Sequence, residues 1–384
     1  MKRCAAAVVG AGIVGAAVAR ELAVRDVDVC LLDAGEVANA TTGLGEGNVL
    51  CSDKDAGPEL ELAIRGLELY DELELRLGAQ AQIRRKGALI VHPESDTWAS
   101  EPTRVKRLGA AGVRGELIDA EDVSQLEPGL TGFVHGASYF PDDLQCSPRA
   151  IAKAFAREVP RVWTGCRVDS VEVVAGRAVG VRTANGLLAA DAVVIAAGPW
   201  SARLAASAGW ELPVEPRWGQ LVQLRSSTGS CPGAIRHKIV DGSYLRSVVD
   251  PGAELQVSSV LETTWEGDVL VGSSRARRGF DSTVDEAVTR AMLERATHLM
   301  PGLRSLPVVR AWSGLRPWLP DHLPAIGPSR VVEGLWAATG HEGAGVALGP
   351  VTGRLIAQVM CAEAPLMDLT PFDPDRFVTA STAR

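Results

Sequence analysis

The N-terminal stretch CAAAVVGAGIVGAAVARELA, residues 4–23, limits most strongly what this chain can fold into. A continuous apolar run leads into glycines at positions 10, 12 and 15, and a second apolar run, VDVCLLD, ends at Asp33. Such runs are typical of strands that are buried on both faces of a parallel sheet. The order strand, glycine turn, helix, strand and acid predicts a domain that binds a dinucleotide.

Each residue of this motif has a physical role in binding. Gly10 permits the tight turn, Gly12 leaves room for the pyrophosphate, and Gly15 lets the helix pack on the strand. The helix N-terminus offers unpaired N–H groups to the phosphates. Asp33 can accept hydrogen bonds from ribose hydroxyls. NAD and FAD both satisfy these residues, so the turn alone does not distinguish them.

The N-terminus also imitates a secretory signal, because MKR precedes an apolar run that ends in small residues. The second strand and its terminal acid favour the folded interpretation. The composition is that of a globular protein: 384 residues, 46% hydrophobic, with a net charge of −8. This length suggests two structural domains. The scattered basic residues argue against nucleic acid or anionic membrane as partners, and no apolar run is long enough to span a bilayer.

The seven cysteines form neither a disulfide framework nor a metal motif. No CxxC pair or zinc-type spacing is present, and no HExxH motif or clustered His/Asp/Glu set suggests another metal. We therefore expect reduced thiols in a cytoplasmic protein.

The remaining chain predicts that the nucleotide-binding domain is assembled from separated pieces. The run ADAVVIAAGPWS, residues 190–201, is strand-like and follows a meander in which VAGRAV and TANGLL form hairpin turns. Near the C-terminus, EGLWAATGHEGAGVALGPVTGRLIAQVM repeats the order strand, glycine loop and helix. We assign residues 1–80, 143–215 and 310–384 to this domain.

The inserted segments, residues 81–142 and 216–309, read differently. Strand-like runs come at short spacing, and TVDEAVTRAMLERATHLM is an amphipathic helix candidate. The tail TPFDPDRFVTASTAR reads as an extended cover with a frayed end. We therefore expect an antiparallel sheet with flanking helices as the second domain. Its expected strands are QIRRKGALIVHP, GQLVQLR, AIRHKIV, SYLRSVV and DVLVGSS.

At this point the chain resembles the D-amino-acid oxidase and glycine oxidase family of flavoproteins over nearly its whole length. Four motifs carry the resemblance, in order: VVGAGIVG, ADAVVIAAGPWS, SGLRPWLPDHLPAIGP and TGHEGAGVALGPVTG. VGSSRARRGFD and TGHEGAG are most similar to bacterial amino-acid dehydrogenases that act on hydroxyproline-type or opine substrates. The resemblance implies an α/β fold with a glutathione-reductase-like FAD-binding Rossmann domain and an α+β substrate domain.

The resemblance also implies a bound FAD whose two ends are gripped by the two glycine loops. The last loop lies against the isoalloxazine, where the helix N-terminus from Gly343 to Val346 can stabilise the charge of the reduced flavin. A covalent link through a cysteine is the alternative, but no cysteine falls in the SGLRPWLPDHLPAIGP stretch, so we expect non-covalent binding. The expected cofactor-binding residues are Gly10, Gly12, Ile13, Val14, Gly15, Asp33, Ala34, Thr41, Thr42, Gly43, Gly47, Asn48, Val168, Ala197, Gly198, Trp200, Gly314, Arg316, Gly340, His341, Glu342, Gly343, Ala344, Gly345 and Val346.

One loop departs from the family pattern. Where the family carries a serine–asparagine–alanine–glycine type segment, this chain has ANATTGLGEGNVLCSDK. Glu46 is the unusual residue of that segment, and it either faces the substrate amine or is only solvated.

The expected catalytic residues are Arg316, His341, Tyr244 and Glu46. By resemblance, Arg316 of GLRP binds the substrate carboxylate through its planar guanidinium, and a structural salt bridge is the alternative. His341 lines the substrate site, bonds the flavin or merely caps a helix. Tyr244 binds substrate or packs in the core, and Lys238 is a further candidate for oxygen activation.

The resemblance implies FAD-dependent oxidation of the C–N bond of a small amino acid, which is D-configured, N-substituted or glycine-like. Hydride passes to flavin N5, and the imine hydrolyses to a 2-oxo acid and an amine. Oxygen or another acceptor then reoxidises the flavin. The alternatives are a flavin-dependent 2-hydroxy-acid or polyol-phosphate dehydrogenase, with His341 as a base, and a flavin-holding subunit of a heteromeric dehydrogenase. Either a homo-oligomer or a hetero-oligomer is compatible with the sequence.

Overall fold

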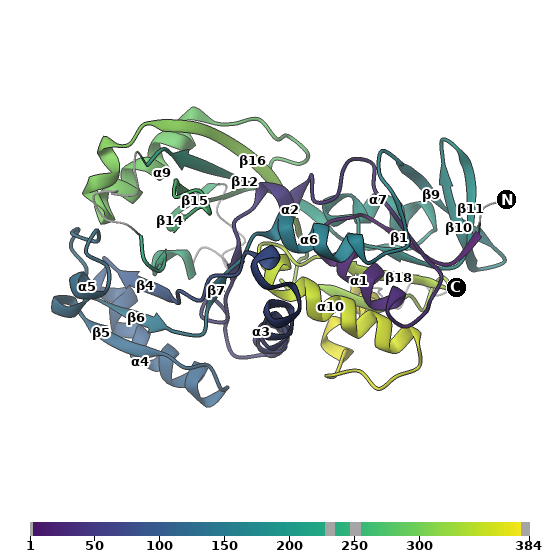
Figure 1. Ribbon diagram of the computed structural model, residues 1–384, viewed down its shortest axis with the longest axis horizontal. Coiled ribbons are helices and arrows are strands. Elements are labelled where there is room, and N and C mark those ends of the chain that lie inside the picture. Colours follow the sequence, from purple (N-terminus) through teal and green to yellow (C-terminus); the bar gives the residue numbers. More distant parts are fainter. Residues whose placement is uncertain (1–2, 227–234, 246–254, 378–384) are drawn as a thin grey trace.

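The computed structural model describes residues 3–226, 235–245 and 255–377. Two large sheets form two lobes, joined by segments that pass between them several times (Figure 1). The fold is of the mixed α/β kind that the sequence predicts.

The first sheet contains the N-terminal strand at its centre. Its order is β17-β18-β11-β1-β2-β8, and β10 and β9 continue antiparallel from β11. Strands β18, β11, β1, β2 and β8 run parallel, as in a doubly wound nucleotide-binding sheet. The strands are β1 (Arg3–Val9), β2 (Val29–Leu32), β8 (Arg161–Trp163), β9 (Val168–Val174), β10 (Arg177–Thr183), β11 (Gly186–Ile195), β17 (Ala325–Pro328) and β18 (Leu335–Thr339).

Strand β1 is buried on both faces, as its continuous apolar run predicts. Ala6 and Val8 belong to the core beneath the helices, whereas Ala7 and Val9 belong to the core beneath the β9–β11 meander. The described helices are α1 (Ile13–Ala23), α2 (Thr41–Leu44), α3 (Pro58–Leu77), α4 (Ser95–Ala110), α5 (Ala120–Leu126), α6 (Pro148–Arg157), α7 (Ser201–Ser207), α9 (Glu286–Leu299) and α10 (Gly345–Met360).

Helices α1 and α10 pack against each other, although they come from opposite ends of the chain (Figure 1). The approach is close because α10 carries a glycine at the contact: a Cβ atom on Gly353 would lie 2.6 Å from the backbone of Ala17. Helices α6 and α3 extend this layer. The two glycine loops are thereby held in one rigid unit.

The second sheet has the order β16-β12-β15-β14-β13-β4-β6-β5, and helix α9 packs on β14 and β15. A separate two-stranded ladder joins β3 (Asn48–Val49) to β7 (Leu144–Gln145). The strands of the second sheet are β4 (Ala88–His92), β5 (Glu116–Asp119), β6 (Gly136–Phe140), β12 (Glu215–Leu224), β13 (Lys238–Asp241), β14 (Leu255–Thr263), β15 (Val269–Ala276) and β16 (Val308–Trp318).

Several expectations about the inserted segments need correction. The sheet is not wholly antiparallel, because β13 and β4 pair in parallel. Of SYLRSVV, residues 243–245 are helical rather than extended, and residues 246–249 lie outside the described part. Strand β14 was not expected. The tail contains two 3₁₀ turns, Thr370–Phe372 and Pro374–Phe377, rather than an extended strand, and its residues 378–384 are not described.

The domain boundaries themselves stay a prediction, with one observation bearing on them. Strand β16 pairs with β12 from Val308 to Trp318, in the second sheet. The expected boundary at residue 310 instead groups most of this strand with the nucleotide-binding domain. Its GLRP motif therefore reaches the cavity from the second lobe.

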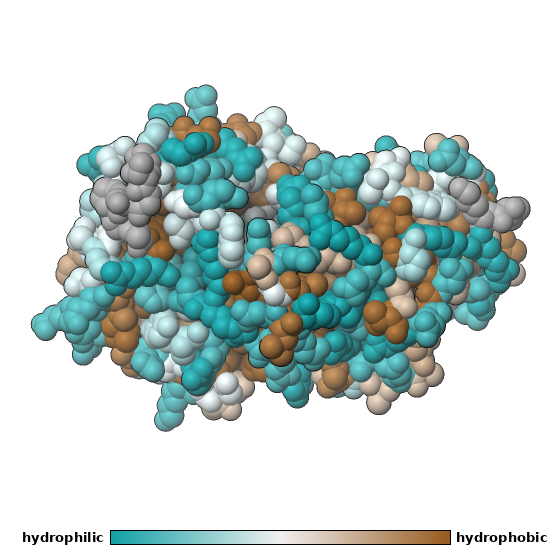
Figure 2. Space-filling model, viewed as in Figure 1, coloured by the Kyte–Doolittle hydropathy of each residue, from teal (hydrophilic) through white to brown (hydrophobic). Residues whose placement is uncertain are grey.

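The visible face of the molecule is mostly hydrophilic, with hydrophobic residues scattered over it rather than gathered in one large patch (Figure 2). Among the described helices, none combines the length and the apolar character that a membrane-spanning helix needs.

Candidate cofactor and substrate site

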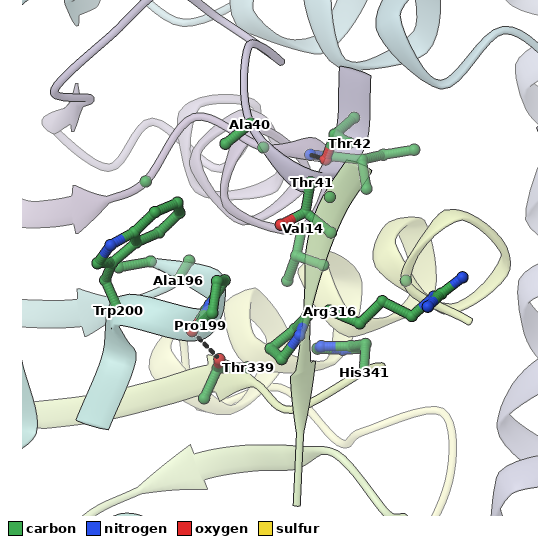
Figure 3. A pocket seen from close by; sticks show the side chains of 18 of the residues that line it. Val14, Ala40, Thr41, Thr42, Ala196, Pro199, Trp200, Arg316, Thr339 and His341 are labelled. Carbon is green, nitrogen blue, oxygen red and sulfur yellow. Dashed lines mark hydrogen bonds between the residues drawn. The ribbon is translucent and has the colours of Figure 1, made fainter. Parts of the chain in front are cut away.

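A large cavity of about 620 Å³ lies between the first sheet and the second. Its walls come from both glycine loops, from the end of β11, and from strands β12, β15 and β16 of the second sheet. Figure 3 shows Thr41 and Thr42 on one side, Trp200 on another, and Arg316 beside His341. A cavity of this size suits a cofactor or a small-molecule ligand.

The N-terminal loop has the geometry that its glycines predict. Gly10 has a φ of 110°, and a Cβ atom there would lie 2.3 Å from the carbonyl oxygen of Ala196. A Cβ atom on Gly15 would lie 1.9 Å from the Gly10 carbonyl oxygen, so Gly15 permits the close packing of helix on turn. Gly15 itself does not line the cavity. Helix α1 begins at Ile13 and directs its first turn toward the cavity.

Asp33 follows β2 and lines the same end of the cavity. Its carboxylate accepts hydrogen bonds from the backbone N–H groups of Ala11 and Gly35, at 2.6 and 2.7 Å. These two bonds fix the carboxylate, and each oxygen keeps acceptor capacity for a ribose hydroxyl. Ala34 and Val168 line this end too.

The loop around α2 is fastened to both neighbouring elements. The Ile13 N–H donates to Thr42 Oγ1 at 3.0 Å, the Thr41 hydroxyl donates to the Leu315 carbonyl at 2.6 Å, and Trp312 Nε1 donates to the Leu44 carbonyl at 2.9 Å. Although its sequence departs from the family pattern, this loop is therefore well anchored on the cavity wall.

The C-terminal glycine loop faces the cavity with Gly343, Gly345 and Val346. The first-turn amides of α10 have no partners within the helix, so they can serve an electron-rich group of a ligand. The Tyr70 hydroxyl fixes this turn by donating to the Val346 carbonyl at 2.7 Å.

His341 lines the cavity but is deeply buried, and its Nε2 lies 2.9 Å from the Thr352 hydroxyl. Burial lowers the pKa of His341 to about 3. The imidazole is therefore neutral near pH 7 and a weak base, which argues against the alcohol-activating role that the hydroxy-acid alternative requires.

Arg316 presents its side chain to the cavity from β16 (Figure 3). Its Nη1 donates to the Ser274 carbonyl at 3.0 Å. No carboxylate of the described residues lies within 4.0 Å of its guanidinium. A Cβ atom on Gly219 of β12 would lie 2.0 Å from Nη1, so a glycine leaves room for this side chain. The salt-bridge alternative for Arg316 has no support among the described residues.

Further charges gather next to Arg316. Glu342 accepts a hydrogen bond from Arg217 at 2.6 Å and lies 3.7 Å from Arg275. Burial alone would raise the pKa of Glu342, but His322, Arg275 and Arg217 hold it at about 2. Tyr244 lines the cavity with its ring 4.4 Å from the Arg275 guanidinium.

Glu46 also lines the cavity, so its solvated alternative is not what the structure has. Its Oε2 accepts a hydrogen bond from Asn48 at 3.0 Å and lies 3.5 Å from Lys238 Nζ. Lys238 does not line the cavity; its ammonium also bonds Glu262 at 3.1 Å.

Most of the expected site residues share this one cavity, although their roles stay predictions. The exceptions lie just behind its wall and pack the loops: Gly15, Gly43, Gly47, Gly340 and Ala344. The members that line it are Gly10, Gly12, Ile13, Val14, Asp33, Ala34, Thr41, Thr42, Glu46, Asn48, Val168, Ala197, Gly198, Trp200, Tyr244, Gly314, Arg316, His341, Glu342, Gly343, Gly345 and Val346.

Of the wall that the second sheet supplies, the sequence predicted Gly314 and Arg316 of β16 but missed the residues of β12 and β15. Gly219, Leu221 and Ser273 line the cavity, and Thr339 closes it by donating to the Gly198 carbonyl at 3.2 Å (Figure 3). The one available signal was Arg275, a charge within the buried strand β15.

The residues present fit a dinucleotide with a ring system at its far end. A close-packed glycine turn and a fixed carboxylate lie at one end of the cavity, and a second helix N-terminus lies at the other. Among the residues that the structure describes, no group of His, Cys, Asp and Glu could hold a metal ion. The fold and the cavity thus define a dinucleotide-dependent oxidoreductase.

Comparison with known proteins names the family. Residues 5–359 match the DAO family, described as FAD dependent oxidoreductase, and the chain belongs to it. Glycine oxidase from Pseudomonas putida is 30% identical over 378 residues, which cover 96% of this chain and 97% of that protein. The crystal structure of glycine oxidase from Geobacillus kaustophilus has a TM-score of 0.88 and 25% identity, covering 99% of this chain and 100% of that one.

Hydrogen cyanide synthase subunit HcnC from Pseudomonas aeruginosa is 28% identical over 327 residues, covering 83% of this chain and 74% of that protein. The predictions of family, fold class and FAD are confirmed. The chain is an FAD-dependent enzyme that oxidises the C–N bond of an amine, and the hydroxy-acid or polyol-phosphate alternative is not favoured.

Proposed function

We propose that the substrate is a small amino acid whose carboxylate binds Arg316. The observation that carries this proposal is a cavity-lining guanidinium without a carboxylate partner among the described residues. An arginine remains charged even where burial and Arg275 lower its pKa, as they do for Arg316. Its planar fork matches a carboxylate in a bidentate pair.

When bound, FAD supplies the acceptor for the hydride that leaves the substrate Cα. The chain's own residues position the substrate for this step. Arg316 holds the carboxylate, while Gly219 leaves room for its guanidinium to lie close to the strands. The imine that results is hydrolysed by water to a 2-oxo acid and an amine.

Anaerobic bleaching of the flavin tests this proposal. The holoenzyme is mixed with glycine, sarcosine, D-alanine or D-proline, and in parallel with glycolate and glycerol 3-phosphate. We expect at least one amino acid to bleach the flavin while the two alcohols leave it oxidised. Bleaching by glycolate or glycerol 3-phosphate alone would contradict the proposal. The narrower expectation of a hydroxyproline-type or opine substrate stays a prediction, which the same assay tests with hydroxyproline and an opine as further probes.

Two further proposals concern the location and the assembly of the enzyme. We infer that the enzyme works in the cytoplasm, because no disulfide joins the six cysteines that the structure describes, and five of them are buried. We also infer an assembly with further subunits as an alternative to a homo-oligomer, since one relative is named as a synthase subunit. Mass measurement of the holoenzyme, alone and with neighbouring gene products, tests the second inference.

A further inference from the structure

Two acceptor atoms beside the cavity lack a donor. Glu46 Oε1 and Asn48 Oδ1 are buried, and neither takes a hydrogen bond in the described structure. Both residues line the cavity. The orientation of the Asn48 amide is set, because its Nδ2 donates to Glu46 Oε2 at 3.0 Å. Buried acceptors without donors cost free energy, so a ligand that brings N–H groups would be favoured here.

The Glu46 acceptor lies on the side of the cavity that the second sheet supplies, and Asn48 is hydrogen-bonded to the same carboxylate. A Cβ atom on Gly272 of β15 would lie 2.7 Å from Glu46 Oε1, and the next residue, Ser273, lines the cavity. Leu221 of β12 borders the same position. Glu46 Oε1 therefore lies against the second sheet, which also carries Arg316, and not at the adenosine end near Asp33.

Glu46 and Arg316 form a pair of opposite charges without touching. Each influences the titration of the other, yet the two side chains are not within the 4.0 Å of an ion pair. A zwitterionic amino acid carries the complementary arrangement, with a carboxylate for Arg316 and an ammonium for Glu46. The ammonium of a primary or a secondary amine has at least two N–H groups. This number matches the two acceptors that lack a donor, Glu46 Oε1 and Asn48 Oδ1.

We propose that Glu46 accepts a proton from the substrate ammonium, while the Asn48 amide oxygen accepts a hydrogen bond from the same group. Lys238 positions the Glu46 carboxylate. This inference rests on the proposed amino-acid oxidation. In the step, one N–H bond breaks and its proton forms an O–H bond on Glu46, which leaves the neutral amine. The Cα–H electron pair then leaves as hydride to the oxidised flavin, and the nitrogen lone pair forms the C=N bond.

The electrostatics of Glu46 suit this role. Burial raises the pKa of its carboxyl, Lys238 opposes that rise, and Glu262 adds to it. Arg316 faces Glu46 from β16, and Lys86, whose pKa burial lowers to about 8, lies beyond near Glu262. Once ionised, a carboxylate with a raised pKa is a better proton acceptor than an ordinary one, and the neighbouring Lys238 favours the ionised form.

The test is the pH dependence of anaerobic flavin reduction, with glycine and sarcosine as probes. In Glu46→Gln, the substrate must arrive as the free amine. We expect the reduction rate at pH 7 to fall about 10²–10⁴-fold. It should recover about tenfold for each pH unit up to the pKa of the amine. A purely structural defect would not recover at high pH.

Two variants that keep Glu46 give a second, signed readout. Lys238→Met removes the cation that favours the ionised carboxylate, so the acid limb of the profile should move to higher pH. Glu262→Gln removes a like charge and should move the same limb to lower pH. Because Glu262 does not line the cavity, Glu262→Gln should shift the limb without the loss of rate that we expect for Glu46→Gln. These shifts decide the question even where Glu46→Gln loads no FAD.

Binding separates the two proposals. Acetate, which has the carboxylate but no amine, should bind Glu46→Gln as tightly as the wild type and Arg316→Ala far more weakly. Wild-type rate and pH profile in Glu46→Gln, or no limb shift in the other two variants, would overturn the role of Glu46 while leaving amino-acid oxidation intact. A wild type that no amino acid reduces would instead defeat the proposed function.

Discussion

Replacing Arg316 with alanine should keep the cofactor and remove most turnover. The guanidinium takes part in no ion pair among the described residues, so its loss breaks only the 3.0 Å bond to the Ser274 carbonyl. Burial and repulsion from Arg275 both lower the pKa of Arg316, and the variant relieves both. Folding and FAD content should therefore stay close to those of the wild type.

The expected loss follows from the substrate contact. Removing a charge-assisted bidentate contact from a desolvated site costs about 2–5 kcal/mol. That range equals about 30-fold to several thousandfold in kcat/KM for an amino acid. Arg316→Lys should recover only part, because an ammonium lacks the planar fork. A decarboxylated amine such as methylamine should be affected far less, since it never had the contact.

Arg310→Ala is the matched control for this experiment. Arg310 lies on the same strand, but it is exposed, stacks on Trp312 and does not line the cavity. Its loss should leave kcat/KM unchanged. Rates of anaerobic flavin reduction for glycine and methylamine separate substrate binding from reoxidation. Equal losses for both compounds in Arg316→Ala would refute the carboxylate contact and make Arg316 a structural residue.

Three other outcomes are expected. Gly12→Val should fold, because Gly12 has an ordinary backbone conformation, but it should lose FAD, because a Cβ atom there lies 3.0 Å from Thr42 Oγ1 at the pyrophosphate site. Gly109→Ala, in open space on α4, is the control. Normal FAD absorbance in Gly12→Val would contradict the assignment. Acid should release free FAD, because the cavity-lining cysteine of the described residues, Cys166, lies at the Asp33 end, away from the expected position of the isoalloxazine ring. Colour that stays with the denatured chain would show a covalent link. The cationic neighbours of Glu342 lower its pKa from 4.5 to about 2 against the effect of burial, so ionised Glu342 should contribute about 3 kcal/mol to the free energy of unfolding. This contribution is present above pH 4.5 and is lost as the pH falls toward 2. Urea unfolding of the holoenzyme at pH 7, 5 and 3 should therefore show a steeper loss of stability than in Glu342→Gln.

The nucleotide end of the site could be read from the sequence because its determinants are local. Gly10, Gly12 and Asp33 fall within one strand–turn–helix–strand unit, whose spacing fixes their geometry. The two hairpin turns of the meander are likewise local, and both are present between β9, β10 and β11.

The substrate wall could not be read in this way. Gly219 and Ser273 reach the cavity only because β12 and β15 pair across long separations, which no short pattern encodes. The strand expected from SYLRSVV begins as a helix at Ser243–Leu245, because a short run without strict apolar alternation does not distinguish a strand from one helical turn. An unusual charged residue was a better signal than hydrophobic periodicity. Glu46, which departs from the family pattern, lies on the cavity wall.

The fastening of the α2 loop to β16 has a consequence for synthesis. Thr41 bonds a carbonyl 274 residues further along the chain, and Trp312 bonds back over 268 residues. On the ribosome, the first glycine turn is therefore complete long before β16, the strand that holds the α2 loop beside it, has been made. The cofactor can be sealed in only after release of the C-terminal helix, so loading is a late step in maturation. A nascent chain stalled within the second sheet would carry half of a nucleotide site and no enclosed cavity.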